Sequence, residues 1–199
     1  MLASRNAGKA AELGHLLQEA PWRLVGLDEV AGGAHVHWTE DAGTYIGNAT
    51  IKARTVAAAT GMPSLADDSG IEVDGLGGWP GVDTATWLGP TATAEELLQG
   101  LVERVRDLPP SRRGASFVCV LVLVPAARQG QPIVVEGRVR GQVVTDPRGA
   151  SGFGYDPVFV PEGRSQTMAE MPEAEKDALS HRGRAARALL LRIAGSSAL

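Results

Sequence analysis

Apolar residues recur at helical spacing in four segments of the chain, and this pattern predicts four helices. Small and branched residues form one stripe over positions 45–60 and end at Gly61, which is typical of a helix stop. Thr93 and Glu96 have the spacing of a capping box at the start of another helix. The predicted helices are one that carries Leu13, Leu16, Leu17 and Ala20 after a short apolar stretch at 1–3, one at 45–60, one that carries Leu97, Leu98, Leu101, Val102 and Val105, and one that follows Met171 and Pro172 and runs to about Ala194.

Three segments between these helices have the pattern of β-strands. Positions 116–124 form a near-continuous apolar run, which suits a strand that is buried on both faces. Shorter and more alternating stretches at 133–139 and 142–145 predict two further strands, with Gly141 as a break between them. Because helices and strands interleave and no linker separates them, we predict an α/β fold in a single domain over residues 1–199.

The charge and the cysteine count narrow the classes of partner and compartment. The 199 residues include 19 basic and 23 acidic side chains, and the net charge of −4 argues against nucleic acid or a membrane surface as partner. The single cysteine, Cys119, lies inside the apolar run 116–124, so we expect a buried side chain rather than a nucleophile. No apolar run approaches roughly 18 residues and no signal peptide pattern opens the chain, so we expect a soluble, cytoplasmic protein.

Lysine and asparagine are scarce in this chain. Lys9, Lys52 and Lys176 are its only lysines, and Asn6 and Asn48 are its only asparagines. A coding bias toward arginine would explain the numbers. Because lysine and arginine are not equivalent at phosphate sites, the positions of these five residues help to locate candidate chemistry.

Two polar segments in the first third of the chain carry four of these five residues. Residues 4–9 lie just before the first helix, where free backbone N–H groups, the helix dipole and Lys9 would favour an anion. An ordinary capped turn accounts for the same residues equally well. Asn48 and Lys52 stand one turn apart on the second helix and can reach the same point in space, although a solvated helix face is the ordinary alternative.

Two adjacent carboxylates, Asp67 and Asp68, follow a short apolar stretch at 64–66. Neighbouring carboxylates that lose hydration repel each other, and a divalent cation or a shared proton relieves that repulsion. Oxygen ligands of this kind favour Mg²⁺ over zinc. The alternative is that the pair merely starts a turn.

A fourth polar segment, 151–157, reads Ser-Gly-Phe-Gly-Tyr-Asp-Pro. The glycines on either side of Phe153 would let a planar ligand approach its ring, and Asp156 and Arg182 could read a base edge. Phe153 could equally be a loop anchor in the core, and His181 alone would be an ordinary helix residue.

These segments occur together and in order, and the chain resembles the inosine triphosphate pyrophosphatase family over nearly its whole length. The motifs that carry the resemblance are Ser4-x-Asn6-x-x-Lys9, Asn48-Ala49-x-x-Lys52-Ala53, 66–70, 77–81, 151–157 and Ser180-His181-Arg182. The chain departs from the family pattern at Ser151, where the family has Gly, at Gly47, where it often has Glu, and at Thr86, where bacterial members usually have Arg. The stretch before Leu2 is also shorter than in the family, so either translation starts upstream or a strand is shortened at its N-terminal end.

The resemblance implies hydrolysis of non-standard purine nucleoside triphosphates (ITP, dITP and XTP) to the monophosphate and pyrophosphate, which would cleanse the nucleotide pool. It also implies an elongated mixed sheet in two lobes with flanking helices, a central active-site cleft, Mg²⁺ as cofactor and a homodimer. The roles that it implies are Asp68 as catalytic base with Asp67 beside it; Ser4, Asn6, Lys9 and Lys52 on the triphosphate; Asn48 and Ser69 as further substrate contacts; Glu40 and Asp68 on Mg²⁺, with Asp41 as the alternative to Glu40; and Phe153, Gly154, Tyr155, Asp156, Lys176, His181 and Arg182 around the base and sugar.

Two other functions stay open at this point. One is a pyrophosphatase that acts on other modified nucleotides, and the other is a catalytically idle nucleotide-binding protein. The intact carboxylate pair together with Lys9 and Lys52 favours an enzyme over the idle protein.

Overall fold

The computed structural model describes residues 1–126 and 131–195, which divide into two compact units. Unit 1 comprises Met1–Asp68, Cys119–Gly137 and the chain from Arg182 onward, and unit 2 comprises Ser69–Val118 and Arg138–His181. Each unit has its own apolar core. The predicted α/β class is confirmed.

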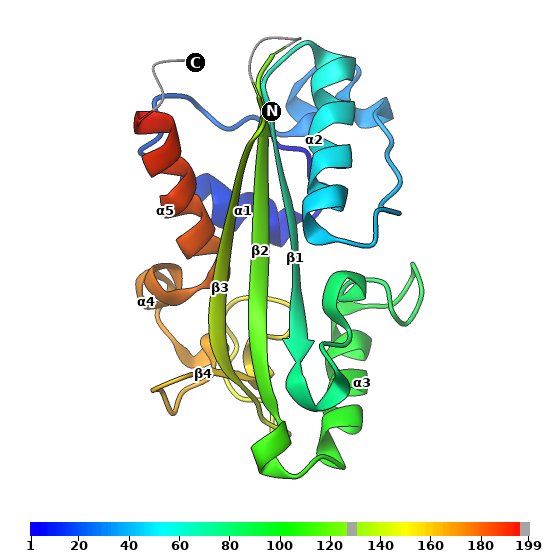
Figure 1. Cartoon of the computed structure of the whole chain (residues 1–199), viewed down its shortest axis with the longest axis vertical. Helices are drawn as coiled ribbons and strands as arrows, with labels where there is room; N and C mark the ends of the chain where they lie inside the picture. The colour runs from blue at the N-terminus through cyan, green and yellow to red at the C-terminus, as the bar shows by residue number, and fades with distance from the viewer. Residues whose placement is uncertain (127–130, 196–199) are drawn as a thin grey trace. The chain divides into compact units, whose positions relative to one another are not determined.

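Among the described residues, the sheet has four strands in the order β1-β2-β3-β4 (Figure 1). The strands are β1 (Ser64–Val73), β2 (Gly114–Val124), β3 (Ile133–Val143) and β4 (Phe159–Pro161). β3 pairs antiparallel with β4, with Gly141 opposite Pro161. Leu2 adds a parallel bridge to Leu65, so the short apolar stretch at the start of the chain lies beside β1.

The predicted break at Gly141 is wrong, because β3 runs continuously through this position. A side chain there would collide with the Val160 carbonyl oxygen and the Phe159 ring of β4. The glycine is therefore explained by the close approach of the neighbouring strand rather than by a strand end.

Unit 1 carries α1 (Ala7–Leu16), α2 (Tyr45–Thr60) and nearly all of α5 (His181–Ala194). Alternate residues of its strands enter two different cores. Leu65 packs in the core that α1 and α5 supply, whereas the next residue, Ala66, packs in the core that α2 supplies. Consecutive residues of β1 therefore face different helices.

Unit 2 carries α3 (Ala94–Arg106) and α4 (Glu173–Leu179). The capping box predicted at the start of α3 is confirmed, because the Thr93 and Glu96 side chains each accept from the other's backbone N–H. The apolar face of α3 packs with Phe117 and Phe159 in the core of this unit. Short 3₁₀ turns at Leu27–Glu29, Gly33–His35, Asp74–Leu76, Gly81–Asp83, Pro110–Arg112, Asp156–Val158 and Met168–Glu170 complete the described helical elements of the two units.

The helix predictions differ from the structure mainly at their ends. α2 has the predicted bounds, and Gly61 ends it in the left-handed conformation (φ 69°). The single helix predicted after Pro172 is wrong, because Ser180 is extended (φ −61°, ψ 155°) and separates α4 from α5. Serine is favoured at the N-cap of a helix, and Ser180 stands immediately before α5. The apolar periodicity of the sequence does not contain this local preference. Across the described ranges, we find no helix whose length and apolar character would let it cross a membrane.

Candidate active site

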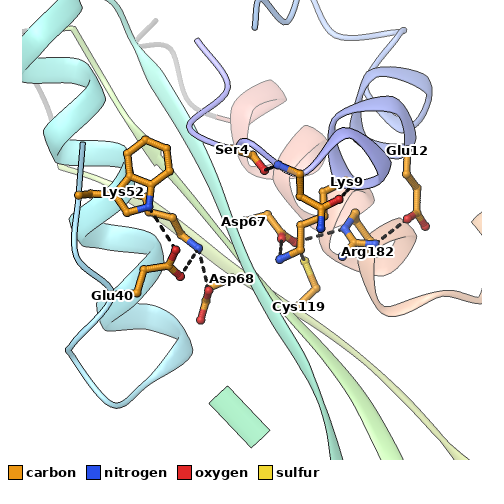
Figure 2. Close-up of polar contacts among 11 residues, drawn as sticks. Ser4, Lys9, Glu12, Glu40, Lys52, Asp67, Asp68, Cys119 and Arg182 are labelled. Atoms are coloured by element: carbon orange, nitrogen blue, oxygen red, sulfur yellow. Dashed lines mark hydrogen bonds and ion pairs between the residues drawn. The ribbon is translucent and has the colours of Figure 1, made fainter. Parts of the chain in front are cut away.

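The predicted carboxylate pair lies in the middle of β1 rather than at a turn. Because side chains alternate along a strand, Asp67 and Asp68 point toward different faces and meet different partners (Figure 2). The prediction that the two carboxylates share one cation or one proton is therefore wrong for the geometry of this strand. Each aspartate has its own set of cations.

Asp67 is fully buried and surrounded by donors. It forms an ion pair with Lys9 of α1, and its Oδ2 accepts from Arg182 Nε at 3.2 Å and from Cys119 Sγ at 3.0 Å. Burial opposes ionisation, but Lys9 and Arg182 hold the pKa of Asp67 far below its usual range. Asp67 is therefore a permanent anion that anchors two cations.

Arg182 joins this group to a residue that the sequence did not reveal. Its Nη1 donates to Glu12 Oε2 at 2.5 Å, and the Arg182 residue is 2% exposed. Burial opposes the charge, yet Asp67 and Glu12 raise the pKa of the Arg182 guanidinium. The predicted role of Arg182 in reading a base edge stays a prediction. The spacing of Glu12 three residues after Lys9 on α1 is the one sequence signal that could have indicated it.

Cys119 confirms the prediction of a buried side chain and shows a use for it. Its residue is 0% exposed, and burial together with the Asp67 carboxylate raises the pKa of the thiol. The thiol donates to Asp67, so it belongs to the same hydrogen-bonded group. The apolar run around it gave no indication of this contact.

Asp68 faces α2 and is less completely satisfied. Lys52 Nζ donates to Asp68 Oδ1 at 2.7 Å and to Glu40 Oε2 at 2.8 Å. Asp68 Oδ2 is buried and has no hydrogen-bond partner among the described residues. Burial raises the pKa of Asp68 to about 6, although Lys52 acts in the opposite direction. Asp68 thus combines a basic carboxylate with a bare oxygen.

Glu40 and Asp68 both form an ion pair with Lys52. The Glu40 side chain is 40% exposed. Its Oε1 also accepts from Trp38 Nε1 at 3.2 Å. Burial opposes ionisation, but the Lys52 contacts lower the pKa of Glu40. Burial likewise opposes the charge on Lys52, whose pKa the Asp68 and Glu40 carboxylates nevertheless raise.

These oxygens fit a hard divalent cation. A buried carboxylate oxygen without a hydrogen-bond partner is costly unless a proton or a cation meets it, and the second carboxylate is held within reach of the same ammonium. The prediction left open whether Glu40 or Asp41 would complete the set. The structure places Glu40, and not the exposed Asp41, on Lys52 with Asp68.

The segment before α1 is a capped helix start with a cation beside it. Asn6 is the N-cap, and its side chain accepts from the Lys9 backbone N–H at 3.1 Å, while Ser4 Oγ accepts from the Asn6 backbone N–H. In α2, Asn48 Oδ1 accepts from the Ala42 backbone N–H at 3.0 Å, which fixes the chain just after Glu40. Both asparagines therefore organise backbone around the two lysines.

Unit 2 brings together three residues of the predicted base site. Asp156 Oδ2 accepts from the Phe153 backbone N–H at 2.9 Å and from Lys176 Nζ at 2.8 Å. The Lys176 ammonium lies 5.3 Å from the centre of the Phe153 ring. A side chain at Gly152 would collide with the Asp156 carboxylate and with Lys176, so this glycine is required for the cluster to form.

The remaining predicted residues of unit 2 have other surroundings. Tyr155 is buried in the core, where its hydroxyl donates to the Thr84 carbonyl at 2.9 Å and accepts from Trp87 Nε1 at 3.0 Å. His181 stacks on Phe117 with ring centres 4.8 Å apart and planes inclined by 15°. Ser69 lies in β1 and Gly154 has a left-handed backbone (φ 63°). Sequence reasoning missed Trp87 and Thr84, which hold the Tyr155 hydroxyl.

Comparison with known proteins matches this arrangement to one family. The family model described as the Ham1 family matches residues 1–191. A dITP/XTP pyrophosphatase of Shigella flexneri is 44% identical over 96% of this chain and 95% of its own length, and one of Frankia alni is 46% identical over 95% and 94%.

Solved structures agree with the sequence comparison. A HAM1 protein from Coxiella burnetii is 37% identical with a TM-score of 0.85, covering 98% of each chain. A nucleoside-triphosphatase, dITP/XTP pyrophosphatase, from Mycobacterium abscessus is 44% identical with a TM-score of 0.74, covering 95% of this chain and 97% of its own. The resemblance found in the sequence motifs is confirmed, and the chain belongs to the Ham1 family.

Proposed function

We propose that this protein is a nucleoside triphosphate pyrophosphatase that hydrolyses dITP, XTP and ITP to the monophosphate and pyrophosphate. Relatives that are 43–46% identical over nearly the whole chain carry the name dITP/XTP pyrophosphatase. The observation that carries the proposal is the Asp68 group, in which a carboxylate with a raised pKa and a bare oxygen shares Lys52 with Glu40. A carboxylate of this kind is suited to accept a proton from an attacking water.

Asp68 and Glu40 are the residues that would hold Mg²⁺. The ion, when bound, would neutralise part of the triphosphate charge. Asp68 Oδ1 is on Lys52 and Oδ2 has no partner among the described residues, so Oδ2 would meet the ion and Oδ1, released by Lys52 to the phosphates, would take the proton of water. We propose Mg²⁺, among the hard divalent cations, as the ion that this site uses.

Lys9 and Lys52 are assigned to the triphosphate. Lys9 is the more accessible of the two, with a side chain that is 17% exposed against 6% for Lys52. Ser4 and Asn6 shape the turn that carries Lys9, and Asn48 shapes the segment beside Lys52. Separate ammonium groups neutralise phosphate charge as point charges and present several donors each.

Phe153, Asp156 and Lys176 are assigned to the base and sugar, with Gly154, Tyr155, His181 and Ser69 as supporting positions. A 6-keto purine presents an acceptor where adenine presents a donor. Lys176 supplies a donor beside the Phe153 ring, which favours the 6-keto group. In this proposal Asp67 and Arg182 affect the substrate indirectly, because Asp67 pairs with Lys9 and Arg182 pairs with Glu12.

The test is pyrophosphate release from dITP, XTP, ITP, GTP and ATP at equal concentration with Mg²⁺ and with other divalent cations. We expect dITP, XTP and ITP to be hydrolysed with a much higher kcat/KM than GTP or ATP. Equal turnover of GTP and ITP would contradict the proposed specificity. Absence of turnover with every nucleotide would favour an idle nucleotide-binding protein.

We also propose that the protein is cytoplasmic and acts as a homodimer, as the sequence resemblance implies. The dimer can be tested by sedimentation of the purified chain at several concentrations. A monomer at all of them would contradict it. That the two units form one domain stays a prediction as well.

A further inference from the structure

Four charged side chains of unit 1 form a connected series that begins and ends on α1. Glu12 accepts from Arg182, Arg182 donates to Asp67, and Asp67 pairs with Lys9, which stands one turn before Glu12 (Figure 2). The series contains two anions and two cations, so its formal charge is zero. It connects α1 with β1 and with the start of α5.

Lys9, at one end of this series, is its most exposed member. The side chains of Asp67, Arg182 and Glu12 are 0%, 3% and 9% exposed, whereas that of Lys9 is 17% exposed. Lys9 is thus the member with the most surface available to a ligand. The other three form a fixed support behind it.

Glu12 is the member whose purpose is least evident from the proposed reaction. Among these four residues, Arg182 and Asp67 carry opposite charges, and Lys9 adds a second positive charge. Glu12 is the second anion of the four and accepts from Arg182 Nη1 at 2.5 Å. Arg182 therefore divides its donors between two anions, with Nη1 on Glu12 and Nε on Asp67, while Lys9 meets the other oxygen of Asp67.

We propose that Glu12 is a positioning residue that acts through Arg182 and Asp67 to hold the Lys9 ammonium toward the phosphates of the substrate. The inference rests on the proposed function only in its assignment of Lys9 to phosphate. Glu12 itself does not touch the substrate. Loss of its charge loosens Lys9 and weakens binding of the phosphate chain, while the Asp68 group on the other face of β1 stays intact.

The experiment is a double-mutant cycle with inorganic pyrophosphate as the probe. Binding is measured by calorimetry for the full chain, for Glu12→Gln, for Lys9→Ala and for the double variant. We expect Glu12→Gln to raise the Kd for pyrophosphate by about three- to tenfold, and to change it by less than about twofold once Lys9 is alanine. An equal effect in both backgrounds, or no effect in the presence of Lys9, would overturn the inference.

Control variants and steady-state kinetics distinguish the positioning role of Glu12 from a purely structural one. Glu12→Gln keeps the shape and one acceptor oxygen, and Glu12→Asp tests whether the charge alone rescues binding. Glu29→Gln, at an exposed Arg23–Glu29 pair of the same unit, is the matched control and should leave pyrophosphate binding unchanged. For dITP, we expect Glu12→Gln to raise KM more than it lowers kcat, and the reverse would overturn positioning of Lys9.

The outcomes separate this inference from the proposed function. If the unaltered protein fails to hydrolyse dITP, the proposed function is wrong, yet the cycle with pyrophosphate still tests the link between Glu12 and Lys9. If dITP is hydrolysed but the cycle shows no coupling, only the inference about Glu12 is wrong.

Discussion

Asp67 and Asp68 are adjacent in sequence, yet their surroundings differ in almost every physical respect. Asp67 faces the α1 and α5 side of β1, where two cations and a thiol meet its oxygens. Asp68 faces the α2 side, where one lysine is shared with Glu40 and one oxygen has no partner among the described residues. The pKa of Asp67 is lowered, and that of Asp68 is raised to about 6.

The difference shows how one strand can supply both a structural anion and a reactive one. A carboxylate with every oxygen occupied stabilises the folded state by pairing buried cations, and it has little capacity to accept a proton. A carboxylate with an unmet oxygen is costly in the free protein, but that oxygen is available to a cation or a proton. The alternation of β1 therefore separates stability from chemistry within two residues.

Asp68→Asn should produce the largest loss of activity. If Asp68 takes the proton of water, kcat for dITP should fall by roughly 10²- to 10⁴-fold, since an amide cannot act as a base. The melting temperature should stay the same or rise, because a buried oxygen with an unfavourable charge is removed. Pyrophosphate release and a thermal melt measure both quantities.

The control for this variant is Asp28→Asn, an exposed position of the same unit that should alter neither quantity. Asp68→Asn with near-normal kcat would remove Asp68 as the base. A large loss of stability in the same variant would show that Asp68, like Asp67, has a mainly structural role.

Asp67→Asn should mainly lower the stability of the folded protein, in contrast to Asp68→Asn. It leaves Lys9 and Arg182 buried without their shared anion, and we expect the free energy of unfolding to fall by about 3–5 kcal/mol. Asp74→Asn, at an exposed pair with Arg140, should change it by about 1 kcal/mol at most. Denaturant unfolding measures both, and an Asp67→Asn variant as stable as Asp74→Asn would contradict the structural role.

The sequence predicted the elements that have a strong local signal. The apolar stripe with Gly61 gave the bounds of α2, and Thr93 with Glu96 gave the start of α3. The family resemblance also implied that Glu40 and Asp68 hold one metal ion, and the structure places both carboxylates on Lys52. Their catalytic roles stay predictions.

The sequence could not show how β1 divides its two aspartates. Asp67, Asp68, Ser69 and Gly70 all have low or modest strand propensity, so the pattern suggested a turn where tertiary packing maintains a strand. The contact of Arg182 with Asp67 spans 115 positions, and no local spacing encodes it. Contacts between residues far apart in the sequence depend on the topology of the fold. For this reason the sequence did not indicate the contacts of Glu12 with Arg182 and of the Cys119 thiol with Asp67.

The pH dependence of stability should carry opposite signs for the two aspartates. Because the pKa of Asp68 is raised above its unfolded value of 3.8, the folded protein binds that proton more tightly, and stability falls as pH rises from about 4 to about 6. Because the pKa of Asp67 is lowered, its contribution is complete above that unfolded value and is lost as the pH falls below it.

Melting temperatures from about pH 3 to about pH 8 in a chelating buffer cover the Asp68 transition and the beginning of the Asp67 transition. Asp68→Asn should flatten the decline between about pH 4 and 6, and Asp67→Asn should reduce the loss of stability at lower pH. Identical pH profiles for the two variants would show that the aspartates are not electrostatically distinct.

Substitution of Cys119 should have the smallest effect of these variants, because its thiol is only one of the donors around Asp67. Its thiol donates to Asp67 Oδ2, and Cys119→Ala removes that donor while both cations stay. We expect the free energy of unfolding to fall by about 1 kcal/mol, with a smaller loss in Cys119→Ser, whose hydroxyl keeps a donor. Because Asp67 supports the reaction only through its cations, kcat for dITP should change by less than about twofold in either variant. A large loss of kcat in a stable Cys119→Ala protein would mean that the Asp67 side of β1 takes a direct part in the chemistry, and that the two faces are not divided as their hydrogen bonds indicate.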